Sequence, residues 1–124
     1  MTTWRYEDGG PQRRQLVEGG LRLGPGDRLV DLACGTGDLA EQAAALGARV
    51  VGIDFAGVML RHARLRGTRA DWLQADAAAL PLADASMDGV VCLEVLEHVP
   101  DPARVLREIA RVLKPGASAW LSMP

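Results

Sequence analysis

The segment Val30–Ala40, with the sequence VDLACGTGDLA, constrains the fold of this chain more than any other feature. An apolar run ends near an acidic residue, passes through a turn that contains glycines, and enters a stretch of helical character. Gly35 and Gly37 lack a Cβ, so the backbone there can approach a ligand closely. Asp38 stands where a helix N-cap is expected. We therefore predict a small-molecule site at the carboxyl end of a strand, where open α/β sheets bind ligands.

Apolar runs and amphipathic stretches alternate along the chain, which is typical of an α/β fold with a doubly wound, mostly parallel sheet. The expected strands cover about 28–33, 49–53, 70–75, 87–93 and 117–122. The expected helices cover about 11–23, 39–46, 57–66 and 102–113. The last helix is the best signalled, because Asp101 can cap it and Pro102 suits its first position. Residues 76–87 leave too little chain for a long helix between two of the strands.

The glycine turn admits two ligand classes. Gly35, Gly37 and Ala40 also satisfy the dinucleotide pattern G-x-G-x-x-G/A. Asp31, just before the turn, separates the two, because a carboxylate there would repel a pyrophosphate and attract an ammonium group. Asp54 ends the next apolar run, where a carboxylate accepts hydrogen bonds from ribose hydroxyls in doubly wound sheets. The two acids together indicate a nucleoside with a positively charged tail, and a nicotinamide nucleotide remains the alternative.

These motifs resemble those of the class I S-adenosylmethionine-dependent methyltransferases from about residue 27 to the last residue. VDLACGTGDLA is similar to the family's first motif, and VVGIDFAGVML to its second strand with the ribose-binding acid. The segments LQADAAALPLADASMDGVV and CLEVLEHVPDPARVLREIARVLKPG follow in the family's order. The GDLA ending is similar to that of the quinone and menaquinone C-methyltransferases, whereas LEVLEHVPDP is similar to the quinone O-methyltransferases and other small-molecule methyltransferases, so the subfamily stays open. The resemblance implies a Rossmann-like sheet of order 3-2-1-4-5, S-adenosylmethionine as cofactor, and methyl transfer to a small-molecule acceptor by in-line displacement.

The resemblance also assigns cofactor contacts residue by residue. The methionyl amine and carboxylate would meet the glycine turn, with Asp31, Ala33, Gly35, Thr36 and Gly37. The carbonyl of Leu93 would meet the same amine. For Asp31 the alternative is a helix-capping role.

The nucleoside end is assigned to the residues that follow the next two strands. Asp54 would bind the ribose, Phe55 and Met59 the adenine face, and Asp76 with the amide of Ala77 the adenine edge. The alternatives are a capping role for Asp54, a turn role for Asp76, and core packing for Phe55 and Met59.

His98 is the candidate catalytic residue. A sulfonium already carries an activated methyl group, so the protein mostly supplies proximity, orientation and desolvation. Where the acceptor must lose a proton, a histidine is suited to take it, and Glu94 and Glu97 are near enough in sequence to orient it. Packing beside the cofactor or within the loop, and plain exposure, are the alternatives for His98. No metal-ligating constellation is present in the sequence, so no metal is predicted.

Composition limits the partners. The net charge is −2, with 14 basic and 16 acidic residues interspersed, so nucleic acid is not expected as a partner. Only two cysteines occur, without C-x-x-C spacing, and both are expected to be reduced. No apolar run of about 18 residues and no leader pattern occurs, so neither a membrane span nor secretion is predicted and a cytoplasmic location is expected.

We expect one domain over 1–124, with a lead helix and entry segment over 1–27 and the Rossmann-like core over 28–124. The resemblance implies a further helix and an antiparallel hairpin after the fifth strand, and we expect the sheet formed by these residues to be without that hairpin. The fifth strand is therefore expected to present an open apolar edge that pairs with a second copy or a partner chain. A truncated cofactor-binding domain without independent turnover is the corresponding alternative function.

Overall fold

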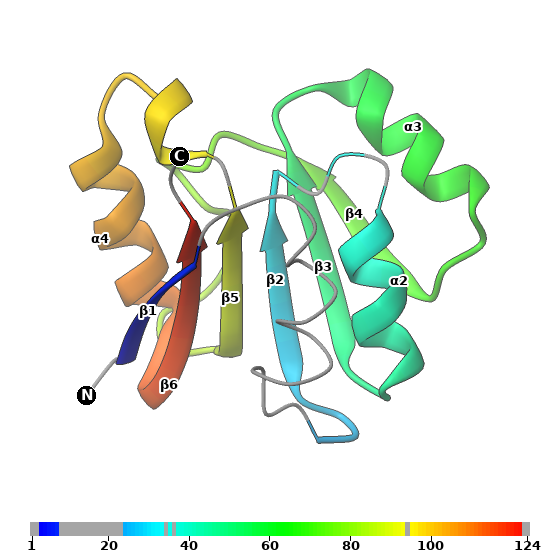
Figure 1. Ribbon diagram of the computed structural model, residues 1–124, viewed down its shortest axis with the longest axis horizontal. Coiled ribbons are helices and arrows are strands. Elements are labelled where there is room, and N and C mark those ends of the chain that lie inside the picture. Colours follow the sequence, from blue (N-terminus) through cyan, green and yellow to red (C-terminus); the bar gives the residue numbers. More distant parts are fainter. Residues whose placement is uncertain (1–2, 8–23, 34, 36, 94, 123–124) are drawn as a thin grey trace.

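The computed structural model describes residues 3–7, 24–33, 35, 37–93 and 95–122. Within them, six parallel strands form one sheet of order β1-β6-β5-β2-β3-β4 (Figure 1). The strands are β1 (Thr3–Glu7), β2 (Arg28–Leu32), β3 (Arg49–Asp54), β4 (Ala70–Gln74), β5 (Met87–Leu93) and β6 (Leu113–Ser122). The helices are α2 (Asp38–Ala45), α3 (Gly57–Leu65), the 3-10 helix η3 (Leu96–His98) and α4 (Pro102–Val112).

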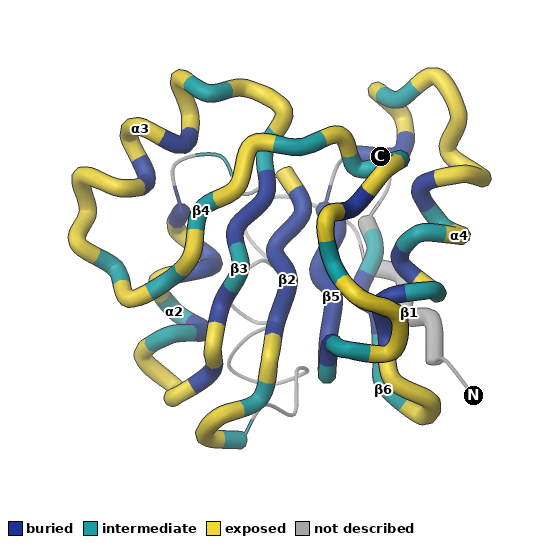
Figure 2. The backbone as a smooth tube through the Cα atoms, turned by 180° about the vertical axis from the view of Figure 1, so that it is seen from behind, coloured by how far each residue is buried: buried dark blue, intermediate teal, exposed yellow. Residues whose placement is uncertain are grey.

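Two apolar clusters cover the two faces of the sheet, because successive strand residues point to opposite faces. Val30 and Leu32 of β2 pack with Val105 and Ile109 of α4 on one face. Leu29 of β2 joins a second cluster with residues of α2 on the other face. Burial is greatest in β2, β3 and β5, while β4 at one side of the sheet is half-buried to exposed (Figure 2). Among the described residues, no helix is both long enough and apolar enough to cross a membrane.

The order of the five strands expected from the sequence is confirmed, reading from β4 through β3, β2 and β5 to β6. The expected lead helix over 11–23 lies outside the described residues. The expectation of an open edge on the fifth strand is wrong, because β1 pairs with β6 in parallel register from Thr3 opposite Ser118 to Glu7 opposite Ser122. The segment 3–7, with Trp4 and Tyr6 alternating with polar residues, is short enough that its strand character was missed. The outer strands of the sheet are therefore β1 and β4.

The caps of two helices contrast. Asp101 caps α4 as expected, since its carboxylate accepts a hydrogen bond from the Arg104 amide at 3.1 Å. The prediction that Asp38 caps α2 is wrong: Gly37 is the N-cap, with φ of 89°, and Asp38 is the first helical residue. The left-handed backbone at Gly37 turns the chain into the helix one residue earlier than expected, and the Asp38 carboxylate instead pairs with Arg66 at 2.8 Å.

Candidate functional site

A cavity of about 470 Å³ opens between the carboxyl ends of β2, β3 and β4 on one side and η3 on the other. Its lining is mostly apolar, with carboxylates and one imidazole as the polar groups. The lining residues are Leu32, Ala33, Ile53, Asp54, Phe55, Ala75, Asp76, Ala77, Val95, His98, Val99 and Pro100. A cavity of this size, with a few polar groups in an apolar wall, is typical of a small-molecule site.

The cavity brings together half of the residues that the sequence indicated. Those in its wall are Ala33, Asp54, Phe55, Asp76, Ala77 and His98. Asp31 and Leu93 are buried in β2 and β5 and do not line it. Gly35, Gly37 and Met59 lie outside the lining, and Thr36 is outside the described residues.

The turn after β2 has an unusual backbone. Ala33, Gly35 and Gly37 all have positive φ, of 56°, 55° and 89°. Glycine adopts this conformation without cost, whereas alanine pays roughly 1–2 kcal/mol for it. Gly37 is further constrained, because a Cβ there would lie 3.0 Å from Cη2 of Trp72. The turn thus keeps a strained conformation that its surroundings must hold in place.

Asp54 ends β3 and faces this turn. Its Oδ2 accepts a hydrogen bond from the Gly35 amide at 3.0 Å, and its Oδ1 accepts one from the Ala56 amide at 2.8 Å. Ala56 is the N-cap of α3, and no side-chain hydrogen bond caps this helix, so the capping alternative for Asp54 is wrong. Its bond to the Ala56 amide, two residues on, instead forms a short turn ahead of the helix. Both oxygens can still accept from a ligand, because a carboxylate has about four lone-pair sites and the side chain also lines the cavity.

Asp76 follows β4 and shapes its own turn. Its Oδ1 accepts from the Ala78 amide at 2.8 Å, and its carbonyl oxygen accepts from the Ala79 amide at 2.9 Å. Both the turn role and the position in the cavity wall expected for Asp76 are therefore observed.

The segment after Asp76 is held against α4 by Arg111. The guanidinium donates to the carbonyl oxygens of Leu80 and Leu82 at 3.0 and 2.8 Å, and to the Glu108 carboxylate at 2.6 Å. The hydrogen bond from Arg111, with a second from the Leu80 amide, holds the pKa of Glu108 below its ordinary value against the opposing effect of burial. Hydrogen bonds from one guanidinium thus attach this segment, which contains no helix, to α4.

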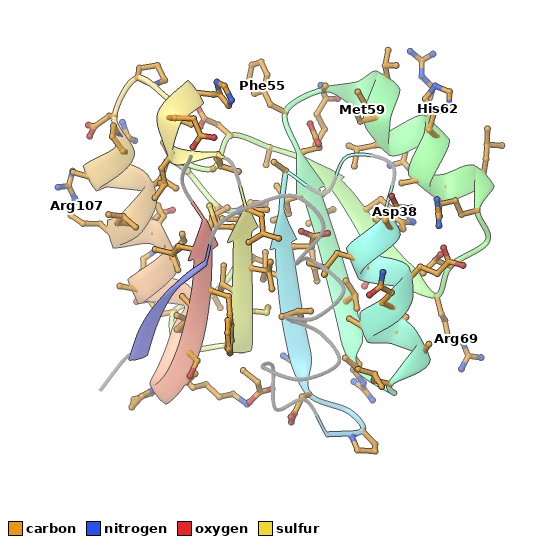
Figure 3. The ribbon with its side chains drawn as sticks, viewed as in Figure 1. Asp38, Phe55, Met59, His62, Arg69 and Arg107 are labelled. Atoms are coloured by element: carbon orange, nitrogen blue, oxygen red, sulfur yellow. The ribbon has the colours of Figure 1, made fainter. Side chains whose placement is uncertain are left out.

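Phe55 and Met59 are exposed, so the core alternative for them is wrong. The exposed fractions are 76% for Phe55 and 41% for Met59. Phe55 projects from the edge of the sheet between α3 and η3, and Met59 lies on α3 (Figure 3). The backbone of Phe55 is anchored from β4, because Gln74 Nε2 donates to its carbonyl oxygen at 3.0 Å. A large exposed aromatic side chain on a cavity wall is suited to stacking on a planar ring.

His98 is the last residue of η3 and lines the cavity from the side opposite β3. Its side chain is 75% exposed, and its Nε2 lies 3.6 Å from a carboxylate oxygen of Glu97. The backbone amide of His98 donates to the Val95 carbonyl oxygen at 2.9 Å, which fixes the short helix. The imidazole therefore reaches both the cavity and solvent.

Asp31 and Cys92 lie close together inside the sheet. Asp31 is 4% exposed and, by strand alternation, lies on the α2 face. Burial, reinforced by the charges of Asp31 and Glu97, raises the pKa of the Cys92 thiol to about 12. Cys92 is thus a core thiol, as expected from the sequence, and Cys34 lies outside the described residues.

Part of the cavity wall was not predicted. Val95, Val99 and Pro100 form the η3 side, and Leu32 and Ile53 form its floor. The η3 side could have been predicted from the sequence, because the segment LEVLEHVPDP directly follows an apolar strand and must cross the same end of the sheet. The floor residues read only as core positions in the sequence.

Comparison with known proteins gives consistent matches. The family model described as a methyltransferase domain matches residues 30–121. A ubiquinone biosynthesis O-methyltransferase from Hahella chejuensis is 47% identical over 117 residues, covering 90% of this chain and 49% of the relative. The corresponding enzyme from Xanthomonas oryzae pv. oryzae is 42% identical over 118 residues, covering 90% and 48%. The structure of an S-adenosylmethionine-dependent methyltransferase from Mesorhizobium loti superposes with a TM-score of 0.77 at 33% identity, covering 87% and 51%. The chain spans about half the length of the curated relatives it matches.

Proposed function

Since the chain belongs to the methyltransferase domain family, we propose that it binds S-adenosylmethionine at the cavity and transfers the methyl group to a small-molecule acceptor. The observation that carries the proposal is the convergence of Ala33, Asp54, Phe55 and Asp76 on one cavity from the ends of three adjacent strands. Each residue has the chemistry that one part of this cofactor requires. The backbone of the turn approaches closely, the two carboxylates accept hydrogen bonds, and the aromatic ring offers a stacking surface.

The nucleoside end of the cofactor fits between β3 and β4. Asp54 has lone pairs left for two ribose hydroxyls after its two backbone hydrogen bonds. Asp76 and the Ala77 amide can meet the donor and acceptor edge of adenine, with Phe55 against the ring. A dinucleotide would place a pyrophosphate beside the buried Asp31 and near Asp54, which disfavours a nicotinamide nucleotide.

The methionyl end is assigned to the glycine turn and its flanks. Asp31 and the Leu93 carbonyl supply negative charge and an acceptor for the ammonium group, and amides of the turn supply donors for the carboxylate. Neither Asp31 nor Leu93 lines the cavity, so the assignment places this end of the ligand at the α2 side of the turn.

The acceptor is proposed to be a hydroxyl of a small phenolic molecule, on the strength of the O-methyltransferase relatives and of the apolar wall formed by Val95, Val99 and Pro100. When bound, S-adenosylmethionine would supply an activated methyl group: the acceptor oxygen would attack its carbon in line, the O–C bond forming as the S–C bond breaks and S-adenosylhomocysteine leaves. His98, at the mouth of the same wall, takes the hydroxyl proton. A phenol with a pKa of about 10 is mostly protonated at neutral pH, so a nearby base raises its reactivity.

Methyl transfer to a panel of catechols and hydroquinones, followed by mass spectrometry, tests this function. His98→Gln should lower the rate by about 10²-fold, the lower range for loss of a general base. His62→Gln is the matched control, because His62 lies on the outer surface of α3, away from the cavity (Figure 3). Equal losses in the two variants would reject His98 as the base. Binding of the cofactor without methylation of any acceptor would favour a cofactor-binding domain without independent turnover.

A further inference from the structure

Two ligand-contacting segments meet at a single carboxylate. The glycine turn leaves β2 and passes the end of β3 before it enters α2 (Figure 1). At that crossing Asp54 accepts the Gly35 amide on Oδ2 and the Ala56 amide on Oδ1. The carboxylate therefore links the turn after β2 to the start of α3.

We propose that Asp54 is a positioning residue that holds the glycine turn and the α3 N-terminus in their binding geometry before any ligand arrives. This inference rests on the proposed function and adds to it a role in the ligand-free protein. The expected hydrogen bonds from ribose to Asp54 exist only when the cofactor is bound, so they give Asp54 no role in the ligand-free protein.

The conformation of the turn supports this role. Three positions with positive φ lie within five residues, and Ala33 is among them without the freedom of glycine. Such a backbone persists only where the surrounding structure determines it. Gly37 is constrained by Trp72 at one end of the turn, and Gly35 is fixed at its centre by Asp54. Since hydrogen bonds to an ionised acceptor are stronger than neutral ones, the carboxylate is suited to hold this backbone.

The acceptor capacity of Asp54 matches both roles together. A carboxylate offers about four lone-pair sites, and the two backbone amides use one on each oxygen. One site on each oxygen remains, which is what two ribose hydroxyls require. Ligand binding then completes the coordination of Asp54 without breaking the link between the segments.

Asp54→Asn separates positioning from a plain ligand contact. An amide side chain has only one acceptor oxygen, so either the Gly35 or the Ala56 amide would face an NH₂ group. Asp76→Asn is the matched control, since Asp76 lines the same cavity but receives its backbone hydrogen bond, from Ala78, on one oxygen. Its amide form can keep that bond.

The experiment is hydrogen exchange of backbone amides by NMR on the ligand-free 124-residue chain. The proposal predicts protected Gly35 and Ala56 amides in the unaltered protein, exchange about tenfold faster or more at one of the two in Asp54→Asn, and no change at either in Asp76→Asn. An unprotected Gly35 amide in the unaltered, ligand-free protein would overturn the proposal, and this comparison requires no variant to fold. Unchanged protection of both Gly35 and Ala56 in Asp54→Asn would also overturn it. Because no ligand is added, failure of the proposed function would leave these results unaffected.

Discussion

Gly37→Ala is expected to destabilise the protein because two costs fall on one residue. The backbone at Gly37 has φ of 89°, which costs an alanine roughly 1–2 kcal/mol. The new Cβ would also lie 3.0 Å from Cη2 of Trp72 and 3.4 Å from Cβ of Ala63. Forcing a methyl group into a packed site costs typically about 1–3 kcal/mol. The sum is about 2–5 kcal/mol of unfolding free energy.

Gly67→Ala separates the two costs. Gly67 follows α3 with φ of 72°, and a Cβ there would meet nothing within 4 Å. This variant should therefore lose only the backbone term, roughly 1–2 kcal/mol. Urea unfolding followed by far-UV circular dichroism gives both values, provided that the dependence on urea is the same in each variant.

A double-mutant cycle with Trp72→Leu then tests the contact itself. Removing the indole should recover part of the loss in Gly37→Ala, so the two substitutions should be less than additive. If Gly37→Ala costs no more than Gly67→Ala, or if the cycle shows no coupling with Trp72, the steric argument is refuted.

Three further outcomes are expected from the charged network and the core thiol. Arg111→Gln should lower the free energy of unfolding in urea by about 1–3 kcal/mol, since it removes charge-assisted hydrogen bonds to the segment after Asp76. The control Arg107→Gln, on the outer face of the same helix (Figure 3), should change the stability little. Equal losses in the two variants would contradict the role given to Arg111. The pKa of Glu108 is lowered in the folded state, so the stability that its carboxylate contributes is complete above its ordinary pKa of 4.5 and is lost as the pH falls through the lower folded pKa. Glu108→Gln should therefore make the decline of stability below about pH 4.5 shallower. An unchanged slope would count against this contribution of Glu108. The pKa of Cys92 is raised to about 12, so iodoacetamide at pH 8 should not alkylate Cys92 in the native protein and should alkylate it rapidly in urea. Mass spectrometry of the Cys92 peptide measures both. Labelling of Cys92 in the native protein would be inconsistent with its burial.

The sequence was sufficient to predict most of the sheet and the ends of the strands that carry the site. Apolar runs flanked by turn residues mark strands directly, and parallel strands place their carboxyl ends at one edge, so Asp54, Asp76 and His98 were expected near one another. The cap at α2 was misplaced by one residue because Gly37 and Asp38 are both acceptable N-caps. Only the left-handed backbone at Gly37 decides between them.

Long-range pairing was less accessible. Pairing of β1 with β6 depends on contacts between the two ends of the sequence; the alternation of Trp4 and Tyr6 favours a strand, but it does not name the partner strand. The Asp54 link to Gly35 is similar, because it joins residues 19 apart through a turn whose φ values no residue pattern fixes. The η3 wall required knowing that the chain turns back over the sheet after β5.

Cofactor binding by the 124-residue chain is best measured by titration calorimetry with S-adenosylhomocysteine. We expect a dissociation constant on the order of micromolar, tighter than that of NAD, and a loss of about 1–3 kcal/mol of binding free energy in Asp54→Ala. Asp71→Ala is the control, since Asp71 is an exposed carboxylate on β4 outside the cavity wall and should leave affinity unchanged. A folded chain that binds no S-adenosylhomocysteine, or that prefers NAD, would show that the cavity is not a site for S-adenosylmethionine.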